Sequence, residues 1–351
     1  MESKCGIAKK VLRSNRGMAL VLTIACISFL VVLTLQIISS VDKEWAGAKA
    51  SAEAVRIDAL LLSGLHLAQA ALYQDQLNNT FDSLQDVWAH FDKDALNKLA
   101  DGADLSIVVE DLSGRLQVNA LGQNKRQAGA GETAGGQRVI TTAEQKRYRA
   151  LWKRFLSSGR FAIDEGDVDA LLDSLADWVD KDNNERPLGA ENGYYQRQDP
   201  PYTARNAPTL YPEELLLVRG MTRALLFGDA EHEGILAYIT ITGDDGRLNL
   251  NTAPLPVLQA LAPAMDETAA QALADFRQSE RNRDALEKTD WVQKVPGLPA
   301  NFTSYLPDLT VSSNFFSVQI QVKQGIYRGQ ARAFLVREKN REQTLLLWKV
   351  N

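Results

Sequence analysis

Residues 180–191 carry oxygen-bearing side chains at a spacing that suits a calcium ion. Asp180, Asp182, Asn184 and Glu191 occupy positions 1, 3, 5 and 12 of this 12-residue segment. Calcium prefers such hard oxygen ligands, and in calcium loops the last glutamate binds through both of its oxygens. Asp199, further along the chain, is a reserve ligand. The spacing therefore predicts a calcium-binding loop.

The segment differs from the usual calcium loop in two respects. Glu185 stands at position 6, where a glycine normally allows a sharp turn, and no helix is evident after Glu191. An amphipathic helix is expected before the loop, over residues 167–179. A solvated acidic turn capped by Asp180 is the alternative interpretation.

The chain offers little material for catalysis. Its histidines, His66, His90 and His232, are far apart, and its cysteines, Cys5 and Cys26, both lie near the N-terminus. The sequence contains no nucleophile elbow, His-Glu-x-x-His motif or catalytic carboxylate pair. We therefore expect that the protein is not an enzyme.

An uncharged apolar run, residues 18–38, predicts a membrane-spanning helix. Its 21 residues would cross the hydrocarbon core, which is about 30 Å thick. Five basic residues and one glutamate precede it, a bias that holds the N-terminus in the cytoplasm and sends the body across the membrane. The small residue Gly17 lies directly before the run, whereas a cleaved secretory signal has its small residues after a shorter apolar core. An uncleaved signal anchor is the alternative.

Net charge gives an indication of the partners. The whole chain of 351 residues has a net charge of −5, and its first 17 residues contribute five positive charges and one negative. The remainder therefore carries about −9, which disfavours nucleic acid and anionic lipid as partners.

The remaining patterns predict a stalk, a sheet and a helical insertion. Helical apolar spacing continues from the membrane run to about Tyr73, with an end at the pair Asn78–Asn79. Residues 105–119 read as two strands around a turn at Ser113–Gly114, and residues 235–251 repeat that pattern. A glycine-rich linker covers residues 123–137, and helices are expected over 142–159, 167–179, 212–226 and much of 254–310. Alternating strands cover 316–322, 330–336 and 343–350.

The fold class expected from these elements is α+β. A long N-terminal helix packs on an antiparallel sheet, and a large, mainly helical insertion lies between early and late strands. The expected boundaries are a leader (1–17), a transmembrane helix (18–38), a stalk with the first strands (39–119), the insertion (120–311) and the last strands (312–351).

Five phrases make the chain resemble the type II secretion protein K family, whose members are minor pseudopilins. They lie at residues 15–22, 175–182, 189–195, 217–222 and 248–254, from the leader to the middle of the insertion. The resemblance implies a pilin-like fold with an insertion similar to SAM and helix-hairpin-helix modules. It also implies leader cleavage by a prepilin peptidase between Gly17 and Met18, methylation of the new N-terminus, and calcium in the insertion.

The resemblance also implies a position and partners. The position is the periplasmic tip of the pseudopilus, reached from a single-pass anchor in the inner membrane. The implied partners are the minor pseudopilins I and J, the major pseudopilin filament and the inner-membrane assembly platform. Leu22 would be the fifth residue of the mature chain, where polymerising pilins carry a glutamate that pairs with the N-terminal ammonium of the subunit above. A subunit with nothing above it has no such partner, so leucine suits the tip.

A membrane-anchored DNA-binding protein of a DNA-uptake or type IV pilus system is the alternative function. Residues 251–258 and 295–298 resemble helix-hairpin-helix modules. However, residues 253–310 contain five Lys or Arg against eight Asp or Glu, and phosphate binding requires the opposite charge. We therefore expect this segment to contact protein and not nucleic acid.

Overall fold

The computed structural model describes residues 16–122, 141–338 and 341–350, and it divides into two compact units, residues 1–59 and 60–351. The first 15 residues of the expected leader and the expected linker at 123–137 lie outside the described residues.

Helix α1 (Arg16–Asn78) forms a single helix of 63 residues, and it ends at the asparagine pair where the sequence predicts an end. Its N-terminal part is long and apolar enough to cross a membrane, with exposed side chains throughout residues 18–38. Two hydroxyl groups in this stretch are satisfied within the helix, because Thr23 Oγ1 donates to the Leu20 carbonyl and Thr34 Oγ1 to the Leu30 carbonyl. Such internal pairing is what a polar group in hydrocarbon requires.

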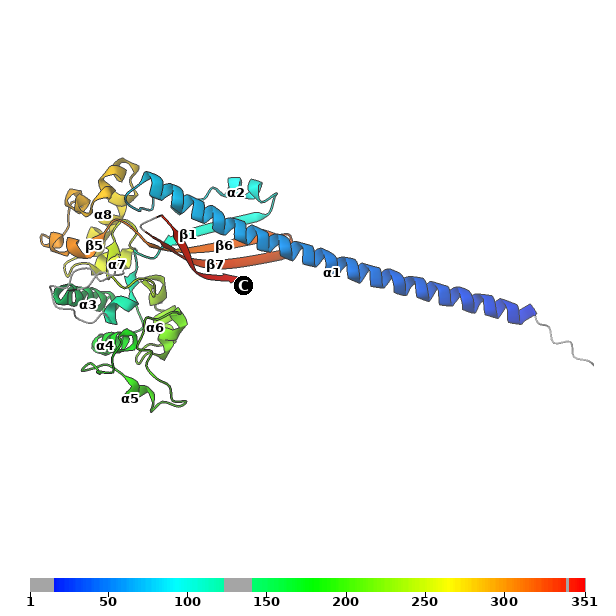
Figure 1. Ribbon diagram of the computed structural model, residues 1–351, viewed down its shortest axis with the longest axis horizontal. Coiled ribbons are helices and arrows are strands. Elements are labelled where there is room, and N and C mark those ends of the chain that lie inside the picture. The colour runs from blue at the N-terminus through cyan, green and yellow to red at the C-terminus, as the bar shows by residue number, and fades with distance from the viewer. Residues whose placement is uncertain (1–15, 123–140, 339–340, 351) are drawn as a thin grey trace, which may run out of the picture. The chain divides into compact units, whose positions relative to one another are not determined.

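The C-terminal part of α1 packs on a four-stranded antiparallel sheet (Figure 1). The strand order is β1 (Asp104–Asp111), β6 (Phe315–Gln324), β7 (Tyr327–Arg337) and β8 (Gln343–Val350). Leu61, Leu65 and Leu72 of the helix are buried. At Gly64 a Cβ atom would lie 2.8 Å from Ile320 Cγ2 of β6, so glycine allows the close approach of helix and sheet. These elements confirm the α+β prediction and the three C-terminal strands.

The two predicted hairpins are wrong, although their strands exist. The second strand of each hairpin belongs to a small parallel ladder: β2 (Leu116–Gln117) pairs with β3 (Ile239–Thr240), and β4 (Leu248–Asn249) pairs with β5 (Leu309–Thr310). The chain leaves the main sheet after β1, where the Asp111 carboxylate is bound both by the turn that follows and by a segment far along the chain. It accepts hydrogen bonds from Ser113 N (2.7 Å) and Asn249 Nδ2 (3.1 Å). These contacts redirect the chain into the insertion.

The insertion between β1 and β6 is mainly helical and has its own aromatic core. Trp152, Phe155, Tyr195 and Trp291 are fully buried in it. Two short elements, η1 (Val87–Ala89) and α2 (Lys93–Leu99), precede β1. The helices of the insertion are η2 (Val118–Gly122), α3 (Thr142–Leu156), η3 (Glu165–Asp167), α4 (Val168–Val179), α5 (Asn192–Tyr195), η4 (Pro212–Leu217), α6 (Arg223–Phe227), η5 (Ile235–Ala237), α7 (Leu255–Ala260), α8 (Glu267–Gln278), η6 (Glu280–Glu287), η7 (Thr289–Lys294) and η8 (Phe302–Asp308).

Candidate metal centre

Helix α4 delivers two carboxylates to the start of the predicted calcium loop. Its apolar side chains pack into the core of the insertion, and this packing fixes the C-terminal end of the helix. Asp177, in the last turn, is fully buried, and Asp180, which caps the helix, is 3% exposed. Burial raises the pKa of both carboxyl groups above their usual range, although ion pairing with Arg186 acts in the opposite direction.

Backbone N–H groups of the loop donate hydrogen bonds to the loop's own acidic side chains. Asp180 Oδ1 accepts a hydrogen bond from Asp182 N (3.2 Å), and Asp182 Oδ1 accepts one from Asn184 N (2.9 Å). These alternating contacts are Asx turns, in which a side chain replaces a backbone acceptor. The Asn184 side chain is exposed. The chain therefore turns at the positions that the spacing assigns to ligands.

Glu191 returns to the cluster from the far end of the loop. It is 3% exposed, and its Oε1 atom is buried without a hydrogen-bond partner. Its Oε2 accepts from Asn192 N (3.3 Å), as the N-cap of α5; the expectation that no helix follows Glu191 is therefore wrong. Burial, with the negative charges of Asp177 and Asp180 nearby, raises the pKa of Glu191 to about 7.

Two members of the site were missed by sequence reasoning. Arg186 donates from Nη1 to Asp177 Oδ1 (2.5 Å) and to Asp180 Oδ2 (2.6 Å), and its backbone N donates to Asp177 Oδ2 (3.1 Å). A helical signal could have found Asp177, because it precedes Asp180 by three residues and therefore lies on the same face. Arg186 gave no comparable signal, since an arginine within a calcium-like loop reads as an exposed residue.

Gly189 allows the loop to close against Asp177. A Cβ atom at this position would overlap Asp177 Oδ2 and lie 2.8 Å from Asp177 Cγ. Gly189 N also donates to the Arg186 carbonyl (3.0 Å), which closes a tight turn. A side chain at residue 189 would therefore displace the buried carboxylate.

The other predicted site residues lie elsewhere. Asp199 is exposed, and no hydrogen bond or ion pair between described residues joins it to the loop. Gly17, Met18 and Leu22 lie in the first turns of α1, where all three are exposed. The processing role of Gly17 and Met18 and the role of Leu22 at the tip stay predictions.

The side chains at residues 177–191 have the chemistry that a calcium ion would require. Asp177, Asp180, Asp182 and Glu191 together supply oxygen ligands of the kind that calcium prefers. Burying an unpaired carboxylate oxygen such as Glu191 Oε1 is costly, and a cation would remove that cost. A bound calcium would supply no reaction here; it would tie the loop to the end of α4.

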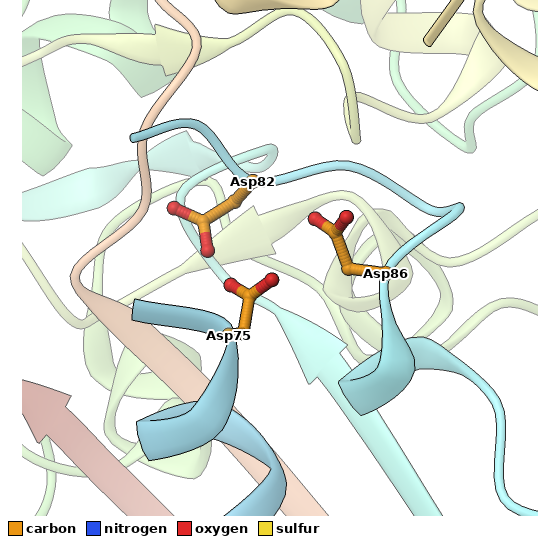
Figure 2. A group of neighbouring side chains, drawn as sticks. All are labelled: Asp75, Asp82 and Asp86. Carbon is orange, nitrogen blue, oxygen red and sulfur yellow. The ribbon is translucent and has the colours of Figure 1, made fainter. Parts of the chain in front are cut away.

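A second acidic cluster, formed by Asp75, Asp82 and Asp86, is an ion-pair junction. One carboxylate oxygen from each residue lies within 4.8 Å of the others (Figure 2). Arg337 of β7 pairs with Asp82 (2.5 Å) and Asp75 (3.4 Å). Arg283 of η6 pairs with Asp86 (2.6 Å). The two guanidinium groups therefore supply the cations of this cluster, and they join the end of α1 to the sheet and the insertion.

The phrase at residues 248–254 belongs to the same junction. Asn249 Nδ2 and Thr252 Oγ1 both donate to Asp111 Oδ2. Asn251 Nδ2 donates to the Leu286 carbonyl (3.0 Å), and its Oδ1 accepts from Trp291 Nε1 (3.0 Å). The polar residues of this phrase therefore connect the strand ends to the helical insertion.

Comparison with known proteins agrees with this architecture. The family described as type II secretion system (T2SS), protein K, matches residues 114–227 and 248–306 through two models. The type II secretion system protein K of Pseudomonas aeruginosa is 28% identical over 286 residues, which are 80% of this chain and 76% of that protein. Its counterpart in Aeromonas hydrophila is 25% identical over 262 residues, 74% of this chain and 73% of that protein.

A solved structure shares the fold. A chain in the crystal structure of the GspK–GspI–GspJ complex from enterotoxigenic Escherichia coli matches with a TM-score of 0.62 and 17% identity. The match covers 87% of this chain and 99% of that chain. The family models, the relatives and the shared fold agree, and the chain belongs to the type II secretion system protein K family.

Proposed function

We propose that the chain is a minor pseudopilin at the tip of the type II secretion pseudopilus. There it initiates and caps the filament, together with the minor pseudopilins I and J, for the export of folded proteins across the outer membrane. Membership of the protein K family supports the role in secretion. The membrane-spanning part of α1 and the sheet that packs on its C-terminal part supply the anchor and the stalk of a pilin-like subunit.

The assignment of the chain to the filament tip depends on the residue at position 22. Leu22 is 67% exposed on α1, within the apolar stretch. A glutamate there would need a cationic partner from a subunit above, and an unpaired carboxylate within the membrane costs about 2.5–3.5 kcal/mol. Leucine avoids this free-energy cost. It also lacks the carboxylate through which a subunit would join beneath another subunit. This chain therefore suits the end of a filament.

The size of the insertion supports the same position. The insertion runs from the end of β1 at Asp111 to the start of β6 at Phe315. It packs around a hydrophobic core of its own. Stacked subunits leave little room for such a volume above each copy. At the distal end no neighbour competes for that space.

The partners I and J follow from the relatives. The complex that shares the fold contains GspI and GspJ, and pseudopilins I and J of the same secretion system are the corresponding partners here. The N-terminus would lie in the cytoplasm and the body in the periplasm, after cleavage by the prepilin peptidase at Gly17.

Co-purification tests this assembly. The full chain, solubilised in detergent and carrying an affinity tag, should retain untagged I and J pseudopilins in equal amounts. The major pseudopilin, tested alone under the same conditions, is the control and should not be retained in equal amounts. Failure to retain I and J, singly or together, would contradict the partner assignment.

The insertion also holds a calcium ion, bound by Asp180, Asp182 and Glu191 with Asp177 and Asn184. The buried, unpartnered Glu191 Oε1 supports this proposal most directly. Calcium ligands at about 2.3–2.6 Å would fasten the loop to α4. A chelator should therefore lower the melting temperature, and Asp180→Ala combined with Glu191→Ala should abolish that response. A melting temperature that changes with neither calcium nor chelator would contradict the calcium proposal.

A further inference from the structure

Arg186 places a positive charge inside the acidic loop. Its guanidinium group bridges Asp177 Oδ1 (2.5 Å) and Asp180 Oδ2 (2.6 Å). The two carboxylates are 0% and 2% exposed, whereas the Arg186 side chain is 23% exposed. The arginine therefore enters the cluster from its solvent side, and both acids lie behind it.

Most of the other carboxylate oxygens of the cluster already accept hydrogen bonds, which a calcium ion bound to them would have to share. Asp180 Oδ1, Asp182 Oδ1 and Glu191 Oε2 already accept backbone N–H groups. Glu191 Oε1 has no partner. The two carboxylate oxygens that Arg186 holds are therefore among the main ligands that the site can offer, along with Glu191 Oε1.

A guanidinium group and a calcium ion cannot use these two oxygens together. Calcium requires oxygen at about 2.3–2.6 Å, and an arginine donor at hydrogen-bond distance from the same atoms would bring two cations into close repulsion. Arginine keeps its charge at any physiological pH, so it cannot relieve the repulsion by losing a proton. The side chain must move away for calcium to bind.

The structure provides space for such a movement. A cavity of about 620 Å³ adjoins the loop, and Arg186, Asp180, Tyr148 and Asp173 are among the residues that line it. Asp173 is only 8% exposed, and it already pairs with Arg149 Nη1 (2.8 Å). Asp180 and Asp182 line this cavity together with Lys146 and Arg149, so a displaced guanidinium group would remain near carboxylates of both charge-paired and loop residues at its edge.

We propose that Arg186 is an exchangeable internal cation, which holds the loop closed without calcium and leaves when calcium binds. This inference rests on the calcium site proposed above. Arg186 would lower the calcium affinity of the loop and so set the calcium concentration at which it fills. It would also keep the carboxylates paired at low calcium, because breaking a buried ion pair leaves an uncompensated charge.

The test compares calcium binding of the full chain in detergent micelles with that of Arg186→Gln, by calorimetric titration with calcium chloride. Glutamine removes the charge but keeps part of the side chain. We expect the variant to bind calcium at least about tenfold more tightly, or about 1.4 kcal/mol, and to melt at a lower temperature than the wild type in chelator.

Arg160→Gln is the matched control. Arg160 lies in the same insertion and donates to Gln259 Oε1 (3.0 Å), so its substitution changes the net charge equally without touching the loop. Its calcium affinity should equal that of the wild type.

The outcomes separate the two proposals. If the wild type binds calcium and Arg186→Gln binds it equally or more weakly, the exchange is refuted and the calcium site stands. If only the variant binds calcium, Arg186 is a permanent counter-ion and the exchange is refuted as well. Absence of binding in both proteins would refute the calcium site and the exchange together.

Discussion

Gly189→Ala should disrupt the calcium loop through a single methyl group. A Cβ atom at residue 189 would lie 2.8 Å from Asp177 Cγ and 3.3 Å from the Cβ of Arg186. Carbon atoms pack at about 3.5 Å or more, so the carboxyl carbon would have to move by at least about 0.7 Å. Metal–ligand distances tolerate about 0.2 Å. The displacement therefore exceeds what coordination allows.

The expected loss can be given a scale. Substitutions that misplace residues supporting a metal site typically reduce metal affinity by about 10–100-fold, and we expect a reduction in this range. Overpacking a buried site costs about 1–3 kcal/mol of stability even without metal. Calorimetric titration with calcium and thermal melting in chelator would measure the two effects separately.

Gly193→Ala is the control for this substitution. Gly193 lies four residues further on, in α5, and a Cβ atom there would meet nothing within 4 Å. The control should keep the calcium affinity of the wild type. If Gly189→Ala also keeps its affinity and its melting temperature, the close approach of the backbone to Asp177 has no role in the site.

Three further substitutions test other parts of the chain. Gly17→Val should block leader removal, because a β-branched side chain does not fit a site built for glycine, and mass spectrometry should find a product about 2 kDa heavier. Gly64→Leu should lower the free energy of unfolding by about 1–3 kcal/mol through overlap with Ile320, whereas Gly47→Leu, with open space around it, should not. Burial raises the pKa of Asp75 from 3.8 to about 6. The protonated carboxyl group therefore contributes its full stabilisation below pH 4. This contribution, up to about 3 kcal/mol, is lost as the pH rises through 6. Asp75→Asn should flatten this part of the stability–pH curve, and an unchanged slope in denaturant titrations would contradict the assignment.

Periodic patterns predicted the elements that depend on local sequence. The apolar run and its continuation predicted α1, because helical spacing persists without a proline over residues 18–77. Alternation predicted β6, β7 and β8; in β6 and β7 buried and more exposed residues alternate along much of the strand, whereas no residue of β8 is buried. The loop spacing likewise predicted that Asp180, Asp182 and Glu191 lie in one region, because these residues are close in sequence.

Long-range contacts could not be predicted in this way. The turn at Ser113–Gly114 looked like a hairpin, but Asp111 is bound by Asn249 and Ser313, which are more than 130 residues away in the chain. Arg186 was missed for a different reason: its partners Asp177 and Asp180 are close in sequence, but its role depends on their burial and not on a motif. Both errors concern buried polar groups whose partners tertiary packing supplies.

The position of the chain on assembled pseudopili tests the tip assignment most directly. Immunogold labelling or cryo-electron tomography of tagged filaments would locate it. We predict one copy at one end of each filament, overlong filaments when the protein is deleted and shorter ones when it is overproduced. Copies spaced along the length of the filaments would contradict the assignment.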